Sequence, residues 1–193
     1  MLYICHFSGF VEVRKCEVFQ GEYPPKLLEL WDIFEQEKGS ENVRPDFLPP
    51  TQLYMLLEFN NGGQDLEKYT FQNATQALAA WRQVIHTVAV AEAALNFEHR
   101  DLHWGNVLVK AAKREHVDYW VAGNRYRVDT HGVEITIIDF SLSRLTSSAA
   151  DGCTIYKNLA NDPTLFTAMG LKNGGDYQFD IYRMMCRDGN FYF

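Results

Sequence analysis

An eight-residue polar segment at positions 99–106 reads His-Arg-Asp-Leu-His-Trp-Gly-Asn. Its Asp101 carries a carboxylate, which can accept a proton from a hydroxyl group. Asn106, five residues later, carries an amide oxygen, and Mg²⁺ prefers oxygen ligands. A second carboxylate, that of Asp139, follows the apolar pair Ile137-Ile138 at the end of an expected strand. These three side chains could deprotonate a hydroxyl group beside a bound metal ion.

The segment fits the catalytic-loop pattern of protein kinases, H-R-D-L-x-x-x-N, at each of its fixed positions. In that pattern the aspartate accepts the proton of the substrate hydroxyl and the asparagine binds magnesium. The run Asp139-Phe140-Ser141 resembles the D-F-G element of kinases, except that Ser141 stands at the glycine position. Each segment alone could be an ordinary polar loop or strand end. Their order along the chain favours a catalytic loop followed by a metal-binding loop.

Two other combinations imitate known sites. His99 and His103 have the spacing of the zinc motif H-E-x-x-H, but Arg100 replaces its glutamate, so the pattern does not favour zinc. Lys15 lies in an alternating segment ahead of a predicted helix that contains Glu29, like the strand lysine and helix glutamate of kinases. No glycine-rich loop precedes Lys15, however, and a solvated surface lysine is the preferred interpretation.

Apolar patterning and turn residues predict the elements that position these side chains. We expect extended structure over residues 1–20, a helix over 26–37, a buried strand over 53–57, a long helix over 75–97, short strands over 107–110 and 134–138, and a helix from about 179. The stretch between the two short strands leaves room for a hairpin. Residues 141–175 are expected to be rich in loops.

Composition limits the class of protein. The chain has 193 residues, 47% of them hydrophobic, and a formal net charge of −7, which indicates a soluble globular chain with one sizeable core. The acidic balance disfavours direct nucleic-acid binding and permits a basic peptide, although it can also serve solubility alone. Neither a membrane span nor a signal peptide is predicted. The four cysteines form no C-x-x-C pair, which fits a reducing compartment.

Several motifs beyond the catalytic loop resemble those of the haspin family of protein kinases, an atypical group known for phosphorylating a threonine near the start of the histone H-three tail. The matching segments are Gln20-Gly21-x-Tyr23-Pro24-Pro25, Trp31-Asp32, Arg44-Pro45-Asp46-Phe47, Leu57-Glu58-Phe59, Gly62-Gly63-x-Asp65-Leu66-Glu67, Val90-Ala91-Glu92-Ala93, Phe97 to Leu108, Ile137-Ile138-Asp139, Leu142-Ser143-Arg144-Leu145 and Gly175 to Arg183. The match covers nearly all of residues 19–185. Trp104 after His103, and D-Y-Q-F-D-I-Y-R in place of the usual A-P-E, distinguish this family from ordinary kinases.

The resemblance implies roles for individual residues. Asp101 would be the catalytic base, and Asn106 and Asp139 would hold Mg²⁺. The residues implied in ATP binding are Phe59 at the gatekeeper position, Asn60, Asn61 and Gly62 in the hinge that contacts adenine, Asp65 near the ribose, Asn106 and Asp139. Asp65 and Asp176 would also face the basic substrate. His99 and Asp180 would support the catalytic loop.

The resemblance also implies an α+β, protein-kinase-like fold that is incomplete. Residues 1–58 would be a remnant of the small lobe with a family-specific insertion, 59–67 the hinge, and 68–193 part of a mostly helical large lobe with short strands. Nothing matches the glycine-rich loop or the strand lysine with its glutamate partner. Nothing would then cover the phosphates, so we expect the chain alone to bind Mg·ATP weakly or not at all. Gly174 stands where the family usually has a second acidic residue, which implies a weaker grip on the substrate.

Two functions remain open at this stage. The first is a haspin-like serine/threonine kinase that transfers the γ-phosphate of ATP to a threonine or serine in a basic peptide, with the histone H-three tail as the leading candidate. The second is a catalytically inactive pseudokinase or binding module for basic tails. Neither requires a membrane or direct nucleic-acid binding. The expected location is the nucleus, in association with chromosomes, with the cytoplasm as the alternative.

Overall fold

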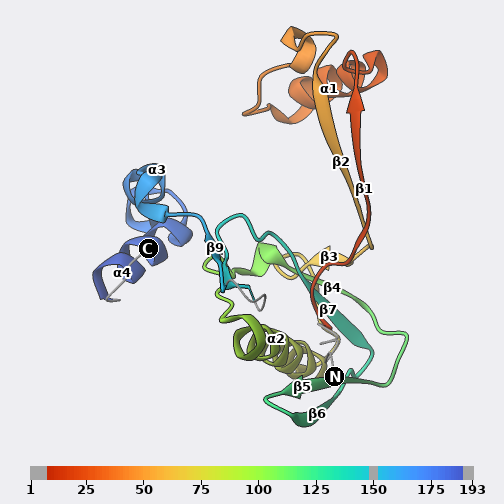
Figure 1. Cartoon of the computed structure of the whole chain (residues 1–193), viewed down its shortest axis with the longest axis vertical. Coiled ribbons are helices and arrows are strands. Elements are labelled where there is room, and N and C mark those ends of the chain that lie inside the picture. Colours follow the sequence, from red (N-terminus) through yellow and green to blue (C-terminus); the bar gives the residue numbers. More distant parts are fainter. Residues whose placement is uncertain (1–7, 148–151, 189–193) are drawn as a thin grey trace. The chain divides into compact units, whose positions relative to one another are not determined.

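The computed structural model describes residues 8–147 and 152–188 and has an α+β fold (Figure 1). Its residues form two compact units, one over 12–61 and one that joins the preceding residues to 62 and beyond. Residues 8–11, which the sequence groups with the small lobe, therefore belong to the larger unit. Within the described ranges, no helix has the length and apolar character needed to cross a membrane.

The smaller unit is a strand–helix–strand arrangement. It contains β1 (Val13–Gln20), α1 (Pro25–Lys38), a short 3₁₀ helix (Pro45–Phe47) and β2 (Leu53–Phe59). The two strands are antiparallel, with Gln20 opposite Leu53 and Val13 opposite Phe59. Pro25 lies in the first turn of α1, where its fixed φ suits the helix. The predicted helix over 26–37 is thus confirmed.

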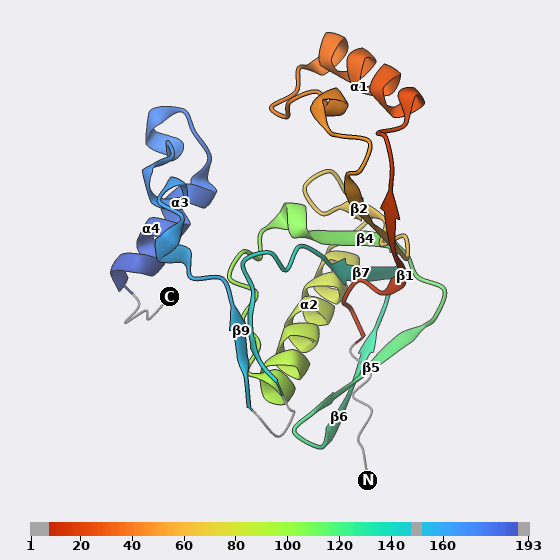
Figure 2. The ribbon, with the colours of Figure 1, turned by 45° about the horizontal axis from the view of Figure 1, so that its top comes forward.

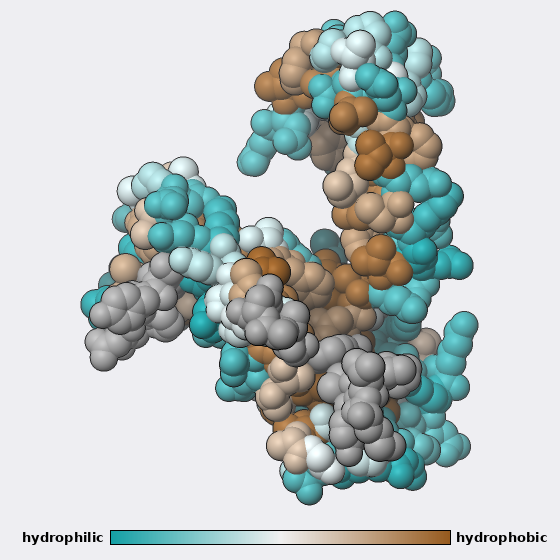
Figure 3. Space-filling view, in the orientation of Figure 1, coloured by the Kyte–Doolittle hydropathy of each residue, from teal (hydrophilic) through white to brown (hydrophobic). Residues whose placement is uncertain are grey.

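The expected strand over 53–57 is present, but the prediction that it is buried was wrong. Met55, Leu56 and Leu57 are 68%, 50% and 47% exposed. The physical reason is that β2 pairs only with β1 in a two-stranded sheet, and a hairpin of two strands has no second layer to cover its apolar face. Hydrophobic side chains are accordingly visible along this hairpin (Figure 3).

The larger unit is organised around a long helix packed on a three-stranded antiparallel sheet. The helix is α2 (Ala74–Leu95), and the sheet has the order β3 (Gln64–Asp65), β4 (Val107–Ala111), β7 (Val133–Ile137). Three predicted elements, the long helix and two short strands, are confirmed. Asn73 caps the helix by accepting a hydrogen bond from the Gln76 backbone N–H at 3.0 Å.

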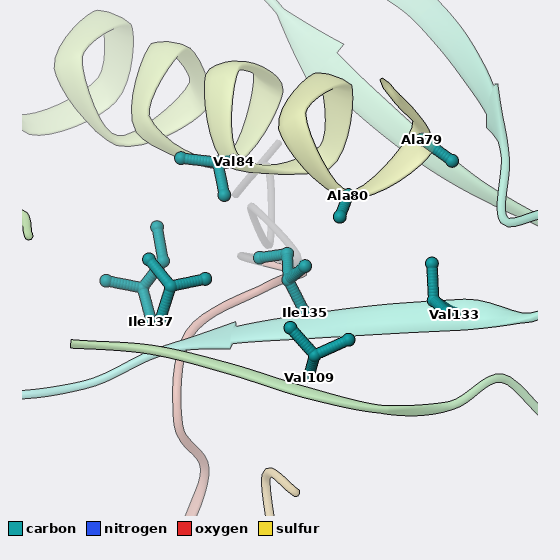
Figure 4. Packing of buried hydrophobic residues seen from close by; sticks show 8 residues of the cluster. Ala79, Ala80, Val84, Val109, Val133, Ile135 and Ile137 are labelled. Carbon is teal, nitrogen blue, oxygen red and sulfur yellow. The ribbon is translucent and has the colours of Figure 1, made fainter. Parts of the chain in front are cut away.

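The face that α2 buries carries mostly small side chains. Figure 4 shows Ala79, Ala80 and Val84 above side chains of β4 and β7. The buried Gln83 joins the two layers, because its Nε2 donates to the Val133 carbonyl at 2.9 Å. Trp81, by contrast, is 61% exposed. Not every large apolar residue at helical spacing along α2 therefore belongs to this core.

The hairpin expected between the two short strands is also present. It consists of β5 (His116–Val121) and β6 (Asn124–Asp129), joined by a two-residue turn. Both turn residues have positive φ, 48° at Ala122 and 82° at Gly123, as a turn of type I′ requires. Val117 and Tyr119 of this hairpin pack with Val90 of α2.

The remaining described residues form a small helical subcluster after a short hairpin (Figure 2). The elements are β8 (Arg144–Thr146), β9 (Thr154–Tyr156), 3₁₀ turns at Leu159–Asn161 and Leu171–Asn173, α3 (Thr164–Thr167) and α4 (Tyr177–Asp188). The helix predicted near residue 179 is confirmed. Tyr182 of α4 packs with the buried Leu142 and Leu159, so this segment has a core of its own.

Candidate active site

Antiparallel pairing of β4 with β7 brings Asn106 and Asp139 to one end of the sheet. Asn106 directly precedes β4, whereas Asp139 lies two residues after the end of β7. Val107 lies opposite Ile137 in the ladder, and the Ile138 backbone N–H donates to the Asn106 carbonyl at 3.0 Å. The two predicted metal ligands therefore come from adjacent chain segments held by a backbone hydrogen bond.

The catalytic-loop segment is closed by hydrogen bonds of its own. The buried Asn106 donates from Nδ2 to the Asp101 carbonyl at 2.9 Å, and the His103 N–H donates to the same carbonyl at 3.1 Å. His103 in turn accepts from the Gly105 N–H on its Nδ1 at 3.1 Å. The Asn106 side chain is thus tied to the backbone of Asp101.

The Asp101 carboxylate is held by two residues of α4. Its Oδ1 accepts hydrogen bonds from the Tyr182 hydroxyl at 2.6 Å and from Gln178 Nε2 at 2.7 Å. Its Oδ2 accepts none from the residues that the structure describes. One oxygen of this half-buried carboxylate is therefore fixed by the protein, and the other is left for an external hydroxyl group.

Asp139 is held in an unusual backbone conformation, with a φ of 62°. Its Oδ1 accepts from the Ser141 hydroxyl at 2.6 Å and from the Ser141 N–H at 3.1 Å. The Ser141 hydrogen bonds lower the pKa of the Asp139 carboxyl below its ordinary value. The side chain is therefore ionised at neutral pH, as a metal ligand must be. Ser141, which departs from the D-F-G pattern, serves as the donor.

His99 bonds to the segment that leads into Asp139. The ring is buried, and burial lowers the pKa of the imidazole. Its Nε2 lies 3.0 Å from the Ile138 carbonyl, and since a carbonyl only accepts, Nε2 carries the proton. The ring also packs against Phe97 and Phe140, with centroids 6.2 and 5.7 Å away. His99 and His103 thus use different partners and do not form a pair.

The expected hinge residues divide between the two units. Phe59, Asn60 and Asn61 belong to the unit over 12–61, where the Asn60 N–H donates to the Glu12 carbonyl at 3.0 Å. Gly62 is buried in the larger unit. A Cβ at Gly62 would lie only 2.7 Å from Leu108 Cδ1, so glycine permits this segment to lie close to β4.

Asp65 is half-buried and is engaged by a lysine three residues later. Its Oδ1 accepts from the Lys68 N–H at 3.0 Å, and its Oδ2 pairs with Lys68 Nζ at 2.9 Å. The side-chain hydrogen bond from Lys68 lowers the pKa of Asp65. An incoming basic side chain at Asp65 would therefore compete with Lys68.

Asp176 lies at the start of α4 and is exposed. Its Oδ1 accepts from the Gln178 N–H at 2.8 Å, which is the bond of a helix-capping aspartate. Asp176 thus caps the first turn of α4. It leaves the negative charge at the surface.

The bonds of Asp180 lie outside the catalytic loop, and its expected support of that loop stays a prediction. Its Oδ2 accepts from the Leu171 N–H at 2.8 Å, and its Oδ1 pairs with Arg183 at 2.7 Å. These bonds hold the segment before α4 rather than residues 99–106. The reason is helical periodicity, because the residues of α4 that reach the catalytic loop are Gln178 and Tyr182, on a different face.

The interpretation of Lys15 as a surface lysine is confirmed. Its Nζ pairs with Glu17, two residues along β1, at 2.7 Å, and its side chain is 55% exposed. Glu29 instead pairs with Lys26 at 2.8 Å, one turn away in α1. The lysine–glutamate pair that these residues imitate in sequence is not formed.

Comparison with known proteins identifies the family. The family described as haspin-like kinase domain matches residues 2–190. The chain belongs to this family. It is 41% identical over 187 residues to serine/threonine-protein kinase haspin of Bos taurus, 42% over 183 to that of Mus musculus, and 38% over 178 to the haspin homolog of Drosophila melanogaster. The predicted resemblance is thereby confirmed.

The matches cover most of this chain but a minor part of each relative. They include 95%, 94% and 92% of this chain, against 23%, 23% and 30% of the three relatives. The chain thus spans about a quarter of the length of the mammalian haspin kinases that it matches.

Sequence reasoning missed the two side chains that hold Asp101. Gln178 and Tyr182 lie within the D-Y-Q-F-D-I-Y-R segment that sets the family apart, at i and i+4 of α4. Their spacing could have shown that they share one face of the helix. Only the fold shows that this face meets Asp101, 77 residues earlier than Gln178.

Proposed function

We propose that the chain carries the catalytic residues of a serine/threonine protein kinase, with Asp101 as the base. The observation that carries this proposal is the arrangement of the Asp101 carboxylate. Its Oδ1 is occupied by Gln178 and Tyr182, and its Oδ2 accepts no bond within the described part of the chain. An oriented carboxylate with one oxygen left over suits the acceptance of a proton from a substrate hydroxyl.

The donors at the end of the sheet fit a magnesium ion. Asn106 supplies an amide oxygen and Asp139 an ionised carboxylate. Mg²⁺ in kinases is commonly bound by one or two such protein ligands, with phosphate oxygens completing the shell. When bound, the ion neutralises charge on the transferred phosphate. Asn106 and Asp139 are the residues that would hold it.

The proposed reaction is a single displacement on ATP. The acceptor oxygen of serine or threonine forms a bond to the γ-phosphorus, and the bond from that phosphorus to the β–γ bridging oxygen breaks. ADP leaves with the electron pair, and the acceptor proton passes to Asp101 Oδ2 and then to water. The contribution of this chain is mainly to position and orient the reactants.

A basic peptide is the proposed substrate. Asp176 is exposed and Asp65 is half-buried, and both carry charge opposite to that of lysine or arginine. Each exposed pair contributes about 1 kcal/mol or less because solvent screens it, so selectivity requires several pairs together. The histone H-three tail, which the family resemblance suggests, is the leading candidate, and the nucleus is the proposed location.

The test is phosphate transfer to a histone H-three tail peptide by the purified chain, measured by mass spectrometry at millimolar Mg·ATP. Asp101→Asn should reduce transfer to a small residual rate and leave nucleotide binding nearly unchanged, because the change removes the proton acceptor. Asp129→Asn, an exposed aspartate of β6, is the matched control and should transfer normally. Binding of the peptide without any transfer would instead support a non-catalytic binding module. Equal turnover of acidic peptides would reject the proposed substrate class.

A further inference from the structure

A closed triangle of hydrogen bonds joins α4 to the catalytic loop. Gln178 Nε2 donates to Asp101 Oδ1 at 2.7 Å and to the Tyr182 hydroxyl at 2.6 Å. The Tyr182 hydroxyl donates to the same Asp101 Oδ1 at 2.6 Å. The groups have enough protons for these three bonds. The Gln178 amide nitrogen carries two N–H protons to donate, and the Tyr182 hydroxyl donates its one proton while its oxygen accepts a bond from Gln178. The three bonds form with a neutral amide and a neutral phenol.

The two donors are held independently of Asp101. The Tyr182 side chain is 4% exposed and packs with Leu142 and Leu159. Gln178 lies one turn earlier on the same face of α4, and its backbone N–H is bound by Asp176 at 2.8 Å. The buried packing of Tyr182 therefore fixes its hydroxyl, which in turn holds Gln178 Nε2.

Tyr182 remains a donor at neutral pH. Burial, and then the hydrogen bond to the Asp101 carboxylate, raise the pKa of the phenol above its ordinary value. A phenolate beside a carboxylate would place two negative charges together. The hydroxyl proton is therefore retained for Asp101.

We infer that Gln178 and Tyr182 are positioning residues for the catalytic base, fixing Asp101 Oδ1 so that Oδ2 is the oxygen that receives the substrate proton. This inference rests on the proposed function and deepens it. Without the two donors, the carboxylate would rotate about its χ angles and either oxygen could face the substrate. Gln178 and Tyr182 of α4 would then affect kcat, the rate of the chemical step, and would leave substrate binding unchanged.

The kinetic test uses Tyr182→Phe, which removes the hydroxyl and keeps the buried ring. We expect kcat to fall about 10-fold, as for the loss of one hydrogen bond to a charged group. The KM values for Mg·ATP and for the peptide should not change. Tyr177→Phe, at a 52% exposed tyrosine of the same helix, is the matched control and should keep its kcat. A purely structural role would instead lower the melting temperature and change both kinetic parameters.

A double-mutant cycle shows whether Tyr182 affects the rate through Asp101 or by another route. In the Asp101→Asn background, Tyr182→Phe should change the residual rate less than about 3-fold, because residues that act through one group are non-additive. A further loss of about 10-fold would overturn the inference. So would an unchanged kcat in Tyr182→Phe when the wild-type chain transfers phosphate.

A spectroscopic test does not depend on activity. With tyrosine labelled with ¹³C at Cζ, the resonance that disappears in Tyr182→Phe belongs to Tyr182. This resonance should shift in Asp101→Ala and keep its position in Asp129→Ala. If the wild-type chain transfers no phosphate, the proposed function fails while this measurement still decides whether Tyr182 holds Asp101. An unshifted resonance in Asp101→Ala would overturn the contact and the inference with it.

Discussion

The buried imidazole of His99 donates from Nε2 to the backbone carbonyl of Ile138 at 3.0 Å. Ile138 directly precedes Asp139, so this bond ties the catalytic loop to the metal-binding loop. It acts together with the bond from the Ile138 N–H to Asn106. The peptide unit on each side of Ile138 is thus held by the segment at 99–106.

His99→Ala should therefore destabilise the larger unit by about 2–3 kcal/mol, through a cavity beside Phe97 and Phe140 and an unpaired, part-buried Ile138 carbonyl. Urea unfolding measures this change. His116→Ala, at a half-buried histidine of β5, should cost less than about 1 kcal/mol. Equal costs for the two variants would show that His99 does not link the loops.

The hinge glycine at position 63 gives a second prediction. Gly63 has a φ of 105°, and a Cβ there would lie 2.1 Å from the Val109 carbonyl oxygen in β4. Gly63→Ala should cost about 3 kcal/mol or more, since strain and a backbone collision add. Gly123→Ala is the control, because Gly123 has a φ of 82° and open space around it. Its cost should be about 1 kcal/mol. Similar unfolding free energies for the two variants would contradict the close approach of residue 63 to β4.

The elements near the site could be predicted because their signals are local. The spacing from Asp101 to Asn106, the apolar residues before Asp139 and the length of α2 are all properties of short stretches of chain. Antiparallel pairing of β4 with β7 then follows from the hairpin inserted between them. The exposure of β2 could not be predicted in this way, because an apolar strand is buried only where another layer covers it.

Contacts between distant segments were beyond such reasoning. The sequence motif includes Gln178, Asp180 and Tyr182 together, and the family resemblance pointed to Asp180 as the brace. Which face of α4 meets the catalytic loop depends on how the helix packs through Leu142 and Leu159. Asp180 lies about 180° around the helix from the face that Gln178 and Tyr182 share, so a rotation of α4 by about half a turn would exchange these roles.

The β5–β6 hairpin should show a specific acid dependence. Asp118 pairs with Arg127 at 3.0 Å and with Arg125 at 2.6 Å. The hydrogen bonds from Arg127 and Arg125 hold the pKa of Asp118 well below its ordinary 3.8. The unfolded chain therefore binds the proton first as pH falls, so this contribution to stability is present above pH 3.8 and is lost as pH falls through the folded pKa.

Urea unfolding of Asp118→Asn checks this dependence. At about pH 5 the variant should be less stable than the wild type, and the difference should shrink as the pH approaches about 2. Asp129→Asn in β6 should show much less convergence, because among the described residues its carboxylate makes no hydrogen bond or ion pair and has only a Coulombic interaction with Arg127. A constant difference between Asp118→Asn and the wild type across this range would mean that the arginine pairs do not stabilise the hairpin.

Substitutions of Asp176 can separate the effect of its charge from that of its helix-capping hydrogen bond. Asparagine caps a helix about as well as aspartate, so Asp176→Asn should keep the bond to the Gln178 N–H and leave the unfolding free energy within about 0.5 kcal/mol. It removes the charge, and the KM for a basic peptide should rise up to about 5-fold, the equivalent of a screened pair of about 1 kcal/mol. Asp176→Lys should raise this KM further, because it reverses the charge facing the peptide.

Asp176→Ala loses the cap as well as the charge. The first turn of α4 should fray, at a cost of about 1 kcal/mol, and carry Gln178 away from Asp101. Its kcat should therefore fall, whereas the kcat of Asp176→Asn should not. Steady-state kinetics with a basic peptide and with a neutral peptide of the same length measure both effects. One outcome would exclude substrate binding by Asp176. If Asp176→Asn and Asp176→Lys leave the KM for the basic peptide unchanged while Asp176→Ala lowers kcat, then Asp176 affects Asp101 only by capping α4.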